Sequence, residues 1–309
     1  MTMLFMAPKL KASSWVKHLR REDPNLDVRV WPEDGPPETV ELILSWKHPL
    51  GEFRKYPNLK CIASLGFGVD HILRDPDLPP GVPITRLVDA AMIRAMSEYV
   101  LAAVLNHTRH FTHFLRNQAL GEWTPRVPLH ASKVRVGIMG LGTLGRGAAA
   151  TLLSQGFPVA GWSRTLKQIE GVSSFAGPEG LDDFLAQSDI LVCLLPLTPA
   201  TRSILDRRVF SRLPAGAYLI NAARGDHLAE EDLLAAIDSD HLSGACLDVF
   251  RTEPLPAGHP FWGHPRVVVT PHIASLTYPA AVAPQIIANY HRVRTGQAPL
   301  NVIDFEKGY

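Results

Sequence analysis

Short apolar runs alternate with amphipathic stretches along the first hundred residues of the chain. The amphipathic stretches include 14–21 and 69–73, which predict helices between several of the runs. Strands that alternate with helices are typical of a parallel sheet covered by helices. The runs predicted as strands in this part are Met3–Met6, Asp27–Trp31, Glu41–Trp46, Lys60–Leu65 and Pro83–Leu87.

The same alternation continues after a long helical pattern that runs from Ala91 to about Gln118. Beyond Pro279, a last helix to about Arg294 has no further strand to join, so we expect it to return to the first domain. The predicted division is 1–100 plus 280–309 for one domain and 101–279 for the other. The strands predicted in the second domain are Val134–Met139, Pro158–Trp162, Ile190–Leu195, Ala217–Asn221, Gly244–Val249 and Val267–Thr270, with helices at Thr143–Ser154, Leu181–Gln187 and Glu230–Asp238.

Composition narrows the class of protein. The chain has 309 residues, 46% of them hydrophobic and 20% charged, which is enough for two domains with cores of their own. A net charge of +1 without blocks of like charge argues against a nucleic-acid or membrane surface. Cys61, Cys193 and Cys246 lie within apolar strand candidates without metal-ligand spacing. Three buried thiols and the absence of a signal-peptide pattern predict a cytoplasmic protein.

A glycine-rich turn between a predicted strand and a predicted helix indicates a dinucleotide site. In Gly140-Leu-Gly142-Thr-Leu-Gly145, the first glycine permits the tight turn and the second lets the backbone approach a pyrophosphate. The third lets the helix pack close to the strand, with the phosphates at the helix N-terminus. This context predicts a Rossmann domain. Its loop residues are Gly140, Gly142, Thr143, Leu144 and Gly145.

The segment after the next predicted strand refines the cofactor. An NAD-binding domain usually carries an acid here that binds the ribose 2′-hydroxyl, but residues 163–167 contain none. Arg164 can offer a forked donor to a 2′-phosphate, so we expect NADP(H) to be preferred, with NAD(H) possible. The residues predicted to contact this end of the cofactor are Ser163, Arg164, Thr165 and Lys167. The alternative is that the two basic side chains are only solvated loop charges.

Three chemically active side chains follow predicted strands of the second domain. Arg224, Glu253 and His272 each come after a different strand, and strand ends in an open parallel sheet face one ligand crevice. Taken singly, each has a simpler explanation, as a surface ion pair, a solvated loop acid and a structural histidine. Together, a cation, a carboxylate and an imidazole on one edge predict a catalytic set.

The order of these motifs resembles the D-2-hydroxyacid dehydrogenase family over nearly the whole chain. The resemblance rests on Gly140-x-Gly142-x-x-Gly145, Asn221-x-Ala-Arg224-Gly225, Asp248-Val-Phe-x-x-Glu253-Pro and Pro271-His272. Within the family, the chain is most similar to the glyoxylate/hydroxypyruvate reductases of the A type. The resemblance implies a Rossmann domain inserted into a flavodoxin-like substrate domain, an active site in the cleft and a homodimer.

The family roles carry over to matching positions. His272 would donate the proton to the ketone oxygen, and Glu253 would favour the protonated ring. Arg224 would bind the substrate carboxylate and polarise the ketone, a forked geometry that lysine does not reproduce. Asp248 would accept from the nicotinamide carboxamide. The residues expected to line the cofactor cleft are Leu195, Pro196 and Ala222.

The substrate side of the site would come from the first domain. Gly66, Phe67 and Gly68 would present backbone N–H groups to the substrate carboxylate, although a simple turn before a helix explains the glycines equally well. Trp46 would lie over the substrate, and Phe67 would narrow the pocket. A narrow pocket favours small 2-keto acids such as glyoxylate and hydroxypyruvate.

Other functions stay open at this point. The substrate could be a bulkier 2-keto acid, or the chain could be a dinucleotide-sensing protein with little turnover. His107, His110 and His113 recur on the long helical stretch, but without a carboxylate or cysteine partner they make a poor zinc site. We therefore predict no metal and place these histidines on the surface or in a dimer contact.

Overall fold

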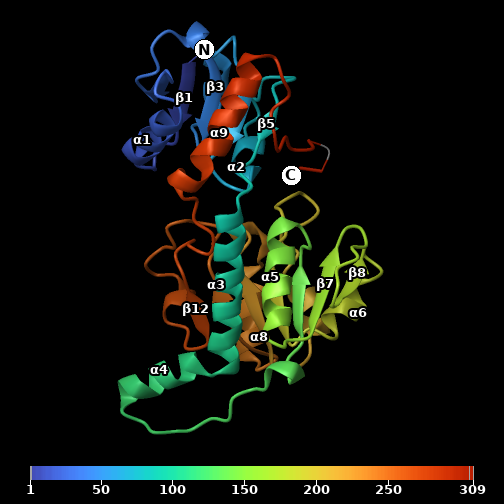
Figure 1. The fold of residues 1–309 in the computed structure, drawn as a ribbon. Coiled ribbons are helices and arrows are strands. Elements are labelled where there is room, and N and C mark those ends of the chain that lie inside the picture. Colours follow the sequence, from blue (N-terminus) through green and yellow to red (C-terminus); the bar gives the residue numbers. More distant parts are fainter. Residues whose placement is uncertain (1, 306, 309) are drawn as a thin grey trace. The chain divides into compact units, whose positions relative to one another are not determined.

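The structure is a computed structural model that describes every residue except Met1, Glu306 and Tyr309. The chain divides into two compact units. The first spans Met1–Met92 and Leu276–Tyr309, and the second spans Ile93–Ser275. Each unit is built around its own parallel sheet (Figure 1).

The first unit places strands in the order β2-β1-β3-β4-β5, and all of its strand pairs are parallel. This order is that of flavodoxin-like folds, as predicted. The strands are β1 (Thr2–Met6), β2 (Val28–Val30), β3 (Val40–Ser45), β4 (Cys61–Ser64) and β5 (Ile84–Thr85). The helices are α1 (Ala12–Glu22), α2 (Asp70–Leu73) and α9 (Pro279–Arg294).

Alternation along β1 explains why both faces of this sheet are covered. Met3 and Phe5 point to a core shared with α1 and α9, whereas Leu4 and Met6 point to a second core on the opposite face. Successive side chains of a strand point to opposite faces, so a fully apolar strand needs a layer on each side. Chain ends far apart in sequence therefore build one unit, because α9 completes the core that α1 begins.

The second unit has the strand order β12-β11-β10-β9-β6-β7-β8, again all parallel. The order reverses between β6 and β9, which is the switch point where Rossmann domains bind dinucleotides. The strands are β6 (Val136–Met139), β7 (Val159–Ser163), β8 (Val172–Ala176), β9 (Ile190–Cys193), β10 (Ala217–Asn221), β11 (Leu242–Leu247) and β12 (Val267–Val269). The helices are α3 (Ala90–Thr108), α4 (Phe111–Leu120), α5 (Thr143–Ser154), α6 (Leu181–Leu185), α7 (Arg207–Arg212) and α8 (Glu230–Asp238).

Three features of this unit differ from the sequence prediction. The edge strand β8 was not predicted, because its sequence VSSFA is polar and only partly buried. The short helix α7 was also missed. The long helical pattern is two helices rather than one, since His110 adopts a left-handed φ of 61° and ends the first. As a result α4 projects from its unit, followed by an extended segment (Figure 1).

Candidate active site

The glycine turn has the shape that a pyrophosphate needs. Gly140 has a φ of +106°, a conformation that side chains rarely adopt, and a Cβ on Gly145 would lie 1.9 Å from the Gly140 carbonyl oxygen. A Cβ on Gly142 would meet nothing within 4 Å, so the space in front of the α5 N-terminus is open. Tight packing behind the turn and open space before it fit a bound phosphate group.

The end of β7 fits an anionic group on the ribose. Ser163 is buried and its hydroxyl donates to the Thr165 carbonyl at 2.8 Å, which shapes the turn. Arg164 is exposed on this turn. Residues 163–168 contain no carboxylate that would repel a 2′-phosphate.

The loop after β9 lies on the other side of the switch point. The backbone carbonyl of Leu194 stands 2.7 Å from where a Cβ on Gly140 would be, so the two loops are adjacent. The Pro196 carbonyl accepts from the Thr201 hydroxyl at 2.7 Å and from His227 Nε2 at 3.3 Å. Leu195 in this loop is buried. The turn is therefore held rigidly beside the glycine loop.

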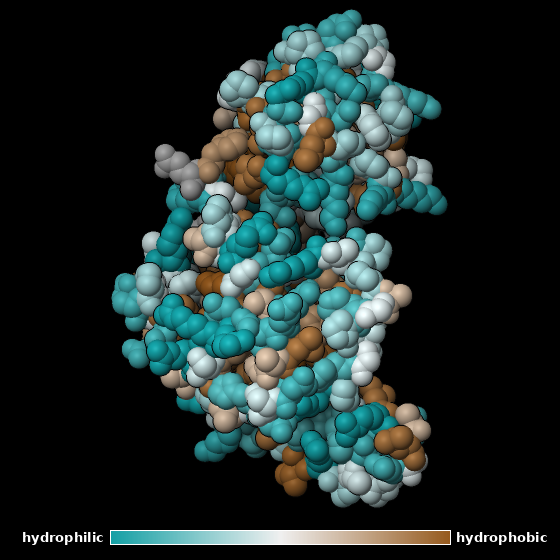
Figure 2. Space-filling model, turned by 180° about the vertical axis from the view of Figure 1, so that it is seen from behind, coloured by the Kyte–Doolittle hydropathy of each residue, from teal (hydrophilic) through white to brown (hydrophobic). Residues whose placement is uncertain are grey.

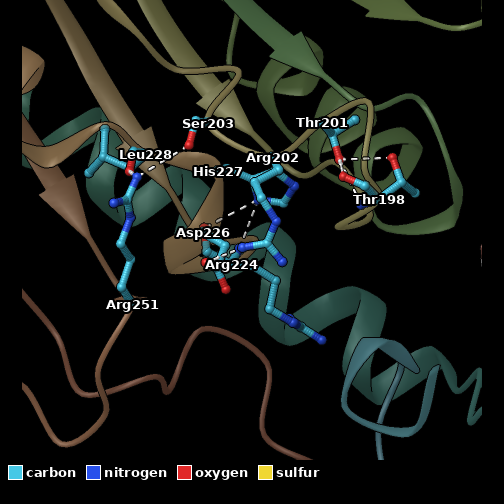
Figure 3. Close-up of polar contacts among 9 residues, drawn as sticks. All are labelled: Thr198, Thr201, Arg202, Ser203, Arg224, Asp226, His227, Leu228 and Arg251. Atoms are coloured by element: carbon cyan, nitrogen blue, oxygen red, sulfur yellow. Dashed lines mark hydrogen bonds and ion pairs between the residues drawn. The ribbon is translucent and has the colours of Figure 1, made fainter. Parts of the chain in front are cut away.

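Arg224 lies in a turn after β10 that is shaped by neighbouring side chains (Figure 3). The buried Asn221 donates to the Arg224 carbonyl at 3.1 Å and accepts from the Ala223 N–H at 3.2 Å. The Arg224 N–H lies 3.2 Å from Nδ1 of His227, a fully buried ring, and its guanidinium donates to the Ala223 carbonyl. Sequence analysis assigned no role to Asn221 or His227. A polar residue at the end of a buried strand was the available signal.

His227 joins two parts of the predicted site. Its ring contacts the Arg224 turn through Nδ1 and the Pro196 loop through Nε2. Gly225, beside Arg224, lies so close to the next loop that a Cβ would be 1.9 Å from the Phe250 carbonyl carbon. The turn that carries the arginine is thus packed against the loops after β9 and β11, with Ala222 buried beneath it.

Glu253 and His272 are in direct contact, as predicted. Nδ1 of His272 lies 2.9 Å from both carboxylate oxygens of Glu253. A carboxylate facing Nδ1 means that Nδ1 donates, so Nε2 is the ring nitrogen left for other chemistry. The imidazole is 33% exposed and the carboxylate 21% exposed, so the pair is accessible from solvent.

Asp248 fixes the backbone around the histidine. Its buried carboxylate accepts from the Thr270 hydroxyl at 2.6 Å and from the N–H groups of Ile273 and Ala274, each at 2.9 Å. Its carbonyl accepts from the His272 N–H at 2.8 Å. These bonds stabilise the left-handed φ of 55° at His272. Oδ2 accepts from one donor only, so one acceptor position on it remains for the predicted contact with a carboxamide.

Trp46, Gly66, Phe67 and Gly68 belong to the first unit. The expectation that all three loop residues offer free N–H groups is wrong for Gly66, whose N–H donates to the Ser64 hydroxyl at 3.2 Å. Within the described part of the chain, the N–H groups of Phe67 and Gly68 have no acceptor. The Phe67 ring lies under the Arg86 guanidinium at 4.7 Å.

The strand order explains which predicted residues come together. Arg224, Glu253 and His272 follow β10, β11 and β12, three neighbouring strands of one sheet. Parallel strands end on the same edge, so all three lie on the edge that carries the glycine loop.

The three helical histidines do not form a cluster. The His107 ring is half-buried and stacks on Tyr218 at 4.1 Å, and burial lowers its pKa to about 4. His110 donates to the Val127 carbonyl, and Asn117 donates to His113. Among the described residues, no three His, Cys, Asp or Glu side chains are grouped to hold a metal ion.

Comparison with known proteins agrees with this geometry. Residues 101–274 match the model of the D-isomer specific 2-hydroxyacid dehydrogenase NAD-binding domain. The chain belongs to this family. Membership of the family confirms that this 2-hydroxyacid dehydrogenase is an NAD(P)-dependent oxidoreductase that acts on a CH–OH group.

Relatives of this dehydrogenase are similar over their full length. The glyoxylate/hydroxypyruvate reductases A of Yersinia enterocolitica and Serratia proteamaculans are 42% and 43% identical to it, with all of both chains covered. A family member from Xanthobacter autotrophicus Py2, solved with NADPH and MES, is 44% identical with a TM-score of 0.95 over 100% and 99% of the two chains. A Sinorhizobium meliloti NADPH-dependent glyoxylate/hydroxypyruvate reductase, solved with NADP and sulfate, is 36% identical with a TM-score of 0.94 and the same coverage.

Two further observations bear on the dehydrogenase's surroundings. No helix in its described residues is long and apolar enough to cross a bilayer. The three cysteines are free and buried, as predicted, and burial raises the pKa of Cys246 to about 11.

Proposed function

We propose that this dehydrogenase reduces small 2-keto acids with NADPH, converting glyoxylate to glycolate and hydroxypyruvate to D-glycerate. The observation that carries the proposal is the His272–Glu253 pair, with Nδ1 engaged by the carboxylate and Nε2 facing away from it. That arrangement suits a ring that delivers a proton rather than one that only supports the fold.

The reaction needs two transfers to the substrate carbonyl. NADPH, when bound along the glycine loop and the Arg164 turn, supplies a hydride to the carbonyl carbon. His272 gives the proton on Nε2 to the carbonyl oxygen, and Glu253 stabilises the charged ring before the transfer. The product is the 2-hydroxy acid, and the ring regains its proton from solvent.

Arg224 binds the substrate carboxylate and polarises the ketone. Asn221 and His227 form hydrogen bonds with the backbone of Arg224, so the position from which its side chain extends is fixed. A forked guanidinium matches a planar carboxylate in two parallel hydrogen bonds. The free N–H groups of Phe67 and Gly68 supply further donors to the same carboxylate. Trp46 lies over the substrate, and Phe67 limits its size.

The direct test is a spectrophotometric assay of NADPH oxidation with glyoxylate, hydroxypyruvate and phenylpyruvate. We expect turnover with the two small acids and little with the bulky one. Higher kcat/KM with phenylpyruvate would favour the bulkier-acid alternative. Tight NADPH binding without turnover on any 2-keto acid would favour the dinucleotide-sensing alternative.

Arg164→Asp should reverse part of the preference for NADPH. The carboxylate would repel a 2′-phosphate and accept from a ribose hydroxyl, so the NADPH to NADH ratio of kcat/KM should fall by more than tenfold. Steady-state kinetics with both cofactors measures the ratio. Arg164→Gln should give a smaller fall, and Arg20→Asp, at an exposed residue of α1, should give none. An unchanged ratio in Arg164→Asp would mean that Arg164 is only a solvated loop charge.

We further propose a homodimer that uses α4 and the segment after it. Figure 2 shows apolar side chains exposed at this end of the second unit. Leu115 is 63% exposed, Trp123 95% and Val127 86%, which is unusual for large apolar side chains on a surface. A second copy covering them would remove this area from water.

Sedimentation velocity tests the dimer. The parent chain should sediment as a dimer at micromolar concentration, and the double variant Leu115→Asp/Trp123→Asp as a monomer. Leu50→Asp, at an exposed leucine of the first unit, is the matched control and should stay dimeric. A monomeric parent chain would contradict the proposal.

We also propose a cytoplasmic location, because the three thiols are free and buried and suit a reducing compartment. Cell fractionation with an antibody against the protein tests this, and recovery outside the cytoplasmic fraction would contradict it.

A further inference from the structure

Two neighbouring strands of the first unit each end in a serine that contacts a buried histidine. Ser45 of β3 and Ser64 of β4 are register partners in the sheet. The Ser45 hydroxyl contacts Nδ1 of His48 at 2.9 Å, and the Ser64 hydroxyl contacts Nε2 of His71 at 3.2 Å. All four side chains are buried. The His48 ring also contacts the Asp75 carboxylate through Nε2. The His71 ring is instead linked through Ser64 to the Gly66–Gly68 loop.

The hydrogen bonds around His71 run in one direction. Nδ1 accepts from the Lys47 N–H at 3.3 Å, so the ring hydrogen lies on Nε2 and is donated to the Ser64 hydroxyl. Ser64 in turn donates to the Gly68 carbonyl at 2.8 Å and accepts from the Gly66 N–H at 3.2 Å. One buried ring thus orients a hydroxyl that holds both glycines of the loop.

The same ring also supports the aromatic side chain over the loop. Trp46 packs edge-on against His71 with ring centroids 4.5 Å apart and planes at 61°. A Cβ on Gly66 would lie 2.6 Å from the Trp46 ring, so the indole rests directly on the glycine. Lys47, next to Trp46, has a left-handed φ of 50°, and its N–H donates the hydrogen bond to Nδ1 of His71.

We propose that His71 and Ser64 are positioning residues for the substrate carboxylate. This inference rests on the proposed function, in which Phe67 and Gly68 donate N–H groups to that carboxylate. Ser64 bonds the Gly66 N–H and the Gly68 carbonyl, which lie on either side of the two donor peptide groups, and it thereby restrains the orientation of the donors between them. Because His71 holds Ser64, Lys47 and Trp46 together, the loop and the aromatic ring keep one relative placement before substrate arrives.

The two ring nitrogens allow a matched pair of variants. His71→Gln places an amide NH₂ where Nε2 lies and keeps the bond to Ser64. His71→Asn places an oxygen where Nδ1 lies and keeps only the bond from Lys47. Ser64→Ala removes both contacts to the loop. The control is His48→Gln, which keeps a donor to Asp75 and leaves the Gly66–Gly68 loop untouched.

The readouts are KM and kcat for glyoxylate, KM for NADPH, and thermal unfolding to confirm that each variant folds. We expect Ser64→Ala to raise the glyoxylate KM by about tenfold or more, which corresponds to about 1.4 kcal/mol. His71→Asn should approach this effect, whereas His71→Gln should recover most of the parent KM. Changes in kcat should be smaller, and KM for NADPH should not change.

A second measurement does not depend on turnover. Calorimetric titration of the enzyme–NADPH complex with oxalate reports carboxylate binding, and its Kd should follow the same order of variants. An inactive parent chain that binds oxalate would refute the proposed reaction while this inference is still tested by the Kd series. Ser64→Ala and His71→Asn with the same KM and oxalate Kd as His48→Gln would overturn the inference, as would a parent chain that does not bind oxalate.

Discussion

Replacing His272 with alanine is expected to lower kcat for glyoxylate reduction by roughly 10²–10⁴-fold, the usual contribution of a positioned general acid. The ketone oxygen would then receive its proton from water instead of Nε2. Affinity for NADPH should stay within about twofold of the parent value, because the histidine is outside the glycine loop. Stopped-flow kinetics and a fluorescence titration with NADPH measure the two quantities.

Glu253→Gln is the companion to this variant. The amide can still accept from Nδ1 but no longer carries the charge that stabilises the protonated ring. We expect kcat to fall, but by less than in His272→Ala, because the imidazole and its Nε2 stay in place. If His272→Ala keeps more than about a tenth of parent kcat, His272 is not the proton donor.

Replacing Arg224 with lysine should lower kcat/KM for glyoxylate nearly as much as replacing it with alanine, by roughly 10²–10⁴-fold. The estimate takes two charge-assisted hydrogen bonds at about 1.5–3 kcal/mol each, which lysine cannot form together. Arg202→Lys is the matched control. Arg202 lies close by and pairs with Asp226 on the surface, so its replacement should change kcat/KM by less than twofold (Figure 3).

Product formation with glyoxylate and hydroxypyruvate, at saturating NADPH, checks this series. A lysine variant with parent kcat/KM would show that only the positive charge matters. An alanine variant with parent kcat/KM would remove Arg224 from the site. Unchanged NADPH affinity in each variant separates substrate effects from cofactor effects.

The sheets were predictable because their strands are apolar on both faces. β1, β3, β4, β6 and β9–β11 are almost fully buried, so each appears in the sequence as a short continuous apolar run. The edge strand β8 lacks this signal, because one side of it faces no neighbouring strand and its residues are partly exposed. The break between α3 and α4 was missed because it depends on one backbone angle at His110, which periodicity does not record.

The candidate site was predictable where the residue types themselves indicate the chemistry, as for an acid and an imidazole that follow neighbouring strands. Glu253 and His272 meet as expected, because strand order alone brings their loops together. The roles of the supporting residues were not predictable, although Asn221 and Ser64 could be noticed as polar residues that end buried strands. Asn221, His227 and Ser64 act through backbone groups of residues near and far in sequence, and a pattern of residue types contains no information on those contacts. The correction at Gly66 has the same cause, since its N–H donates to the hydroxyl of Ser64, the last residue of the preceding strand β4.

The shared core of α1 and α9 has a consequence for synthesis on the ribosome. Met3, Phe5 and Trp15 are translated before the inserted unit, whereas Val282, Ile286 and Tyr290, which cover them, are translated only after it. The inserted unit can complete its sheet first, while one apolar face of the first unit's sheet is still uncovered. During that interval the nascent chain is most exposed to chaperone capture and aggregation, and the interval ends when α9 emerges and packs on this face.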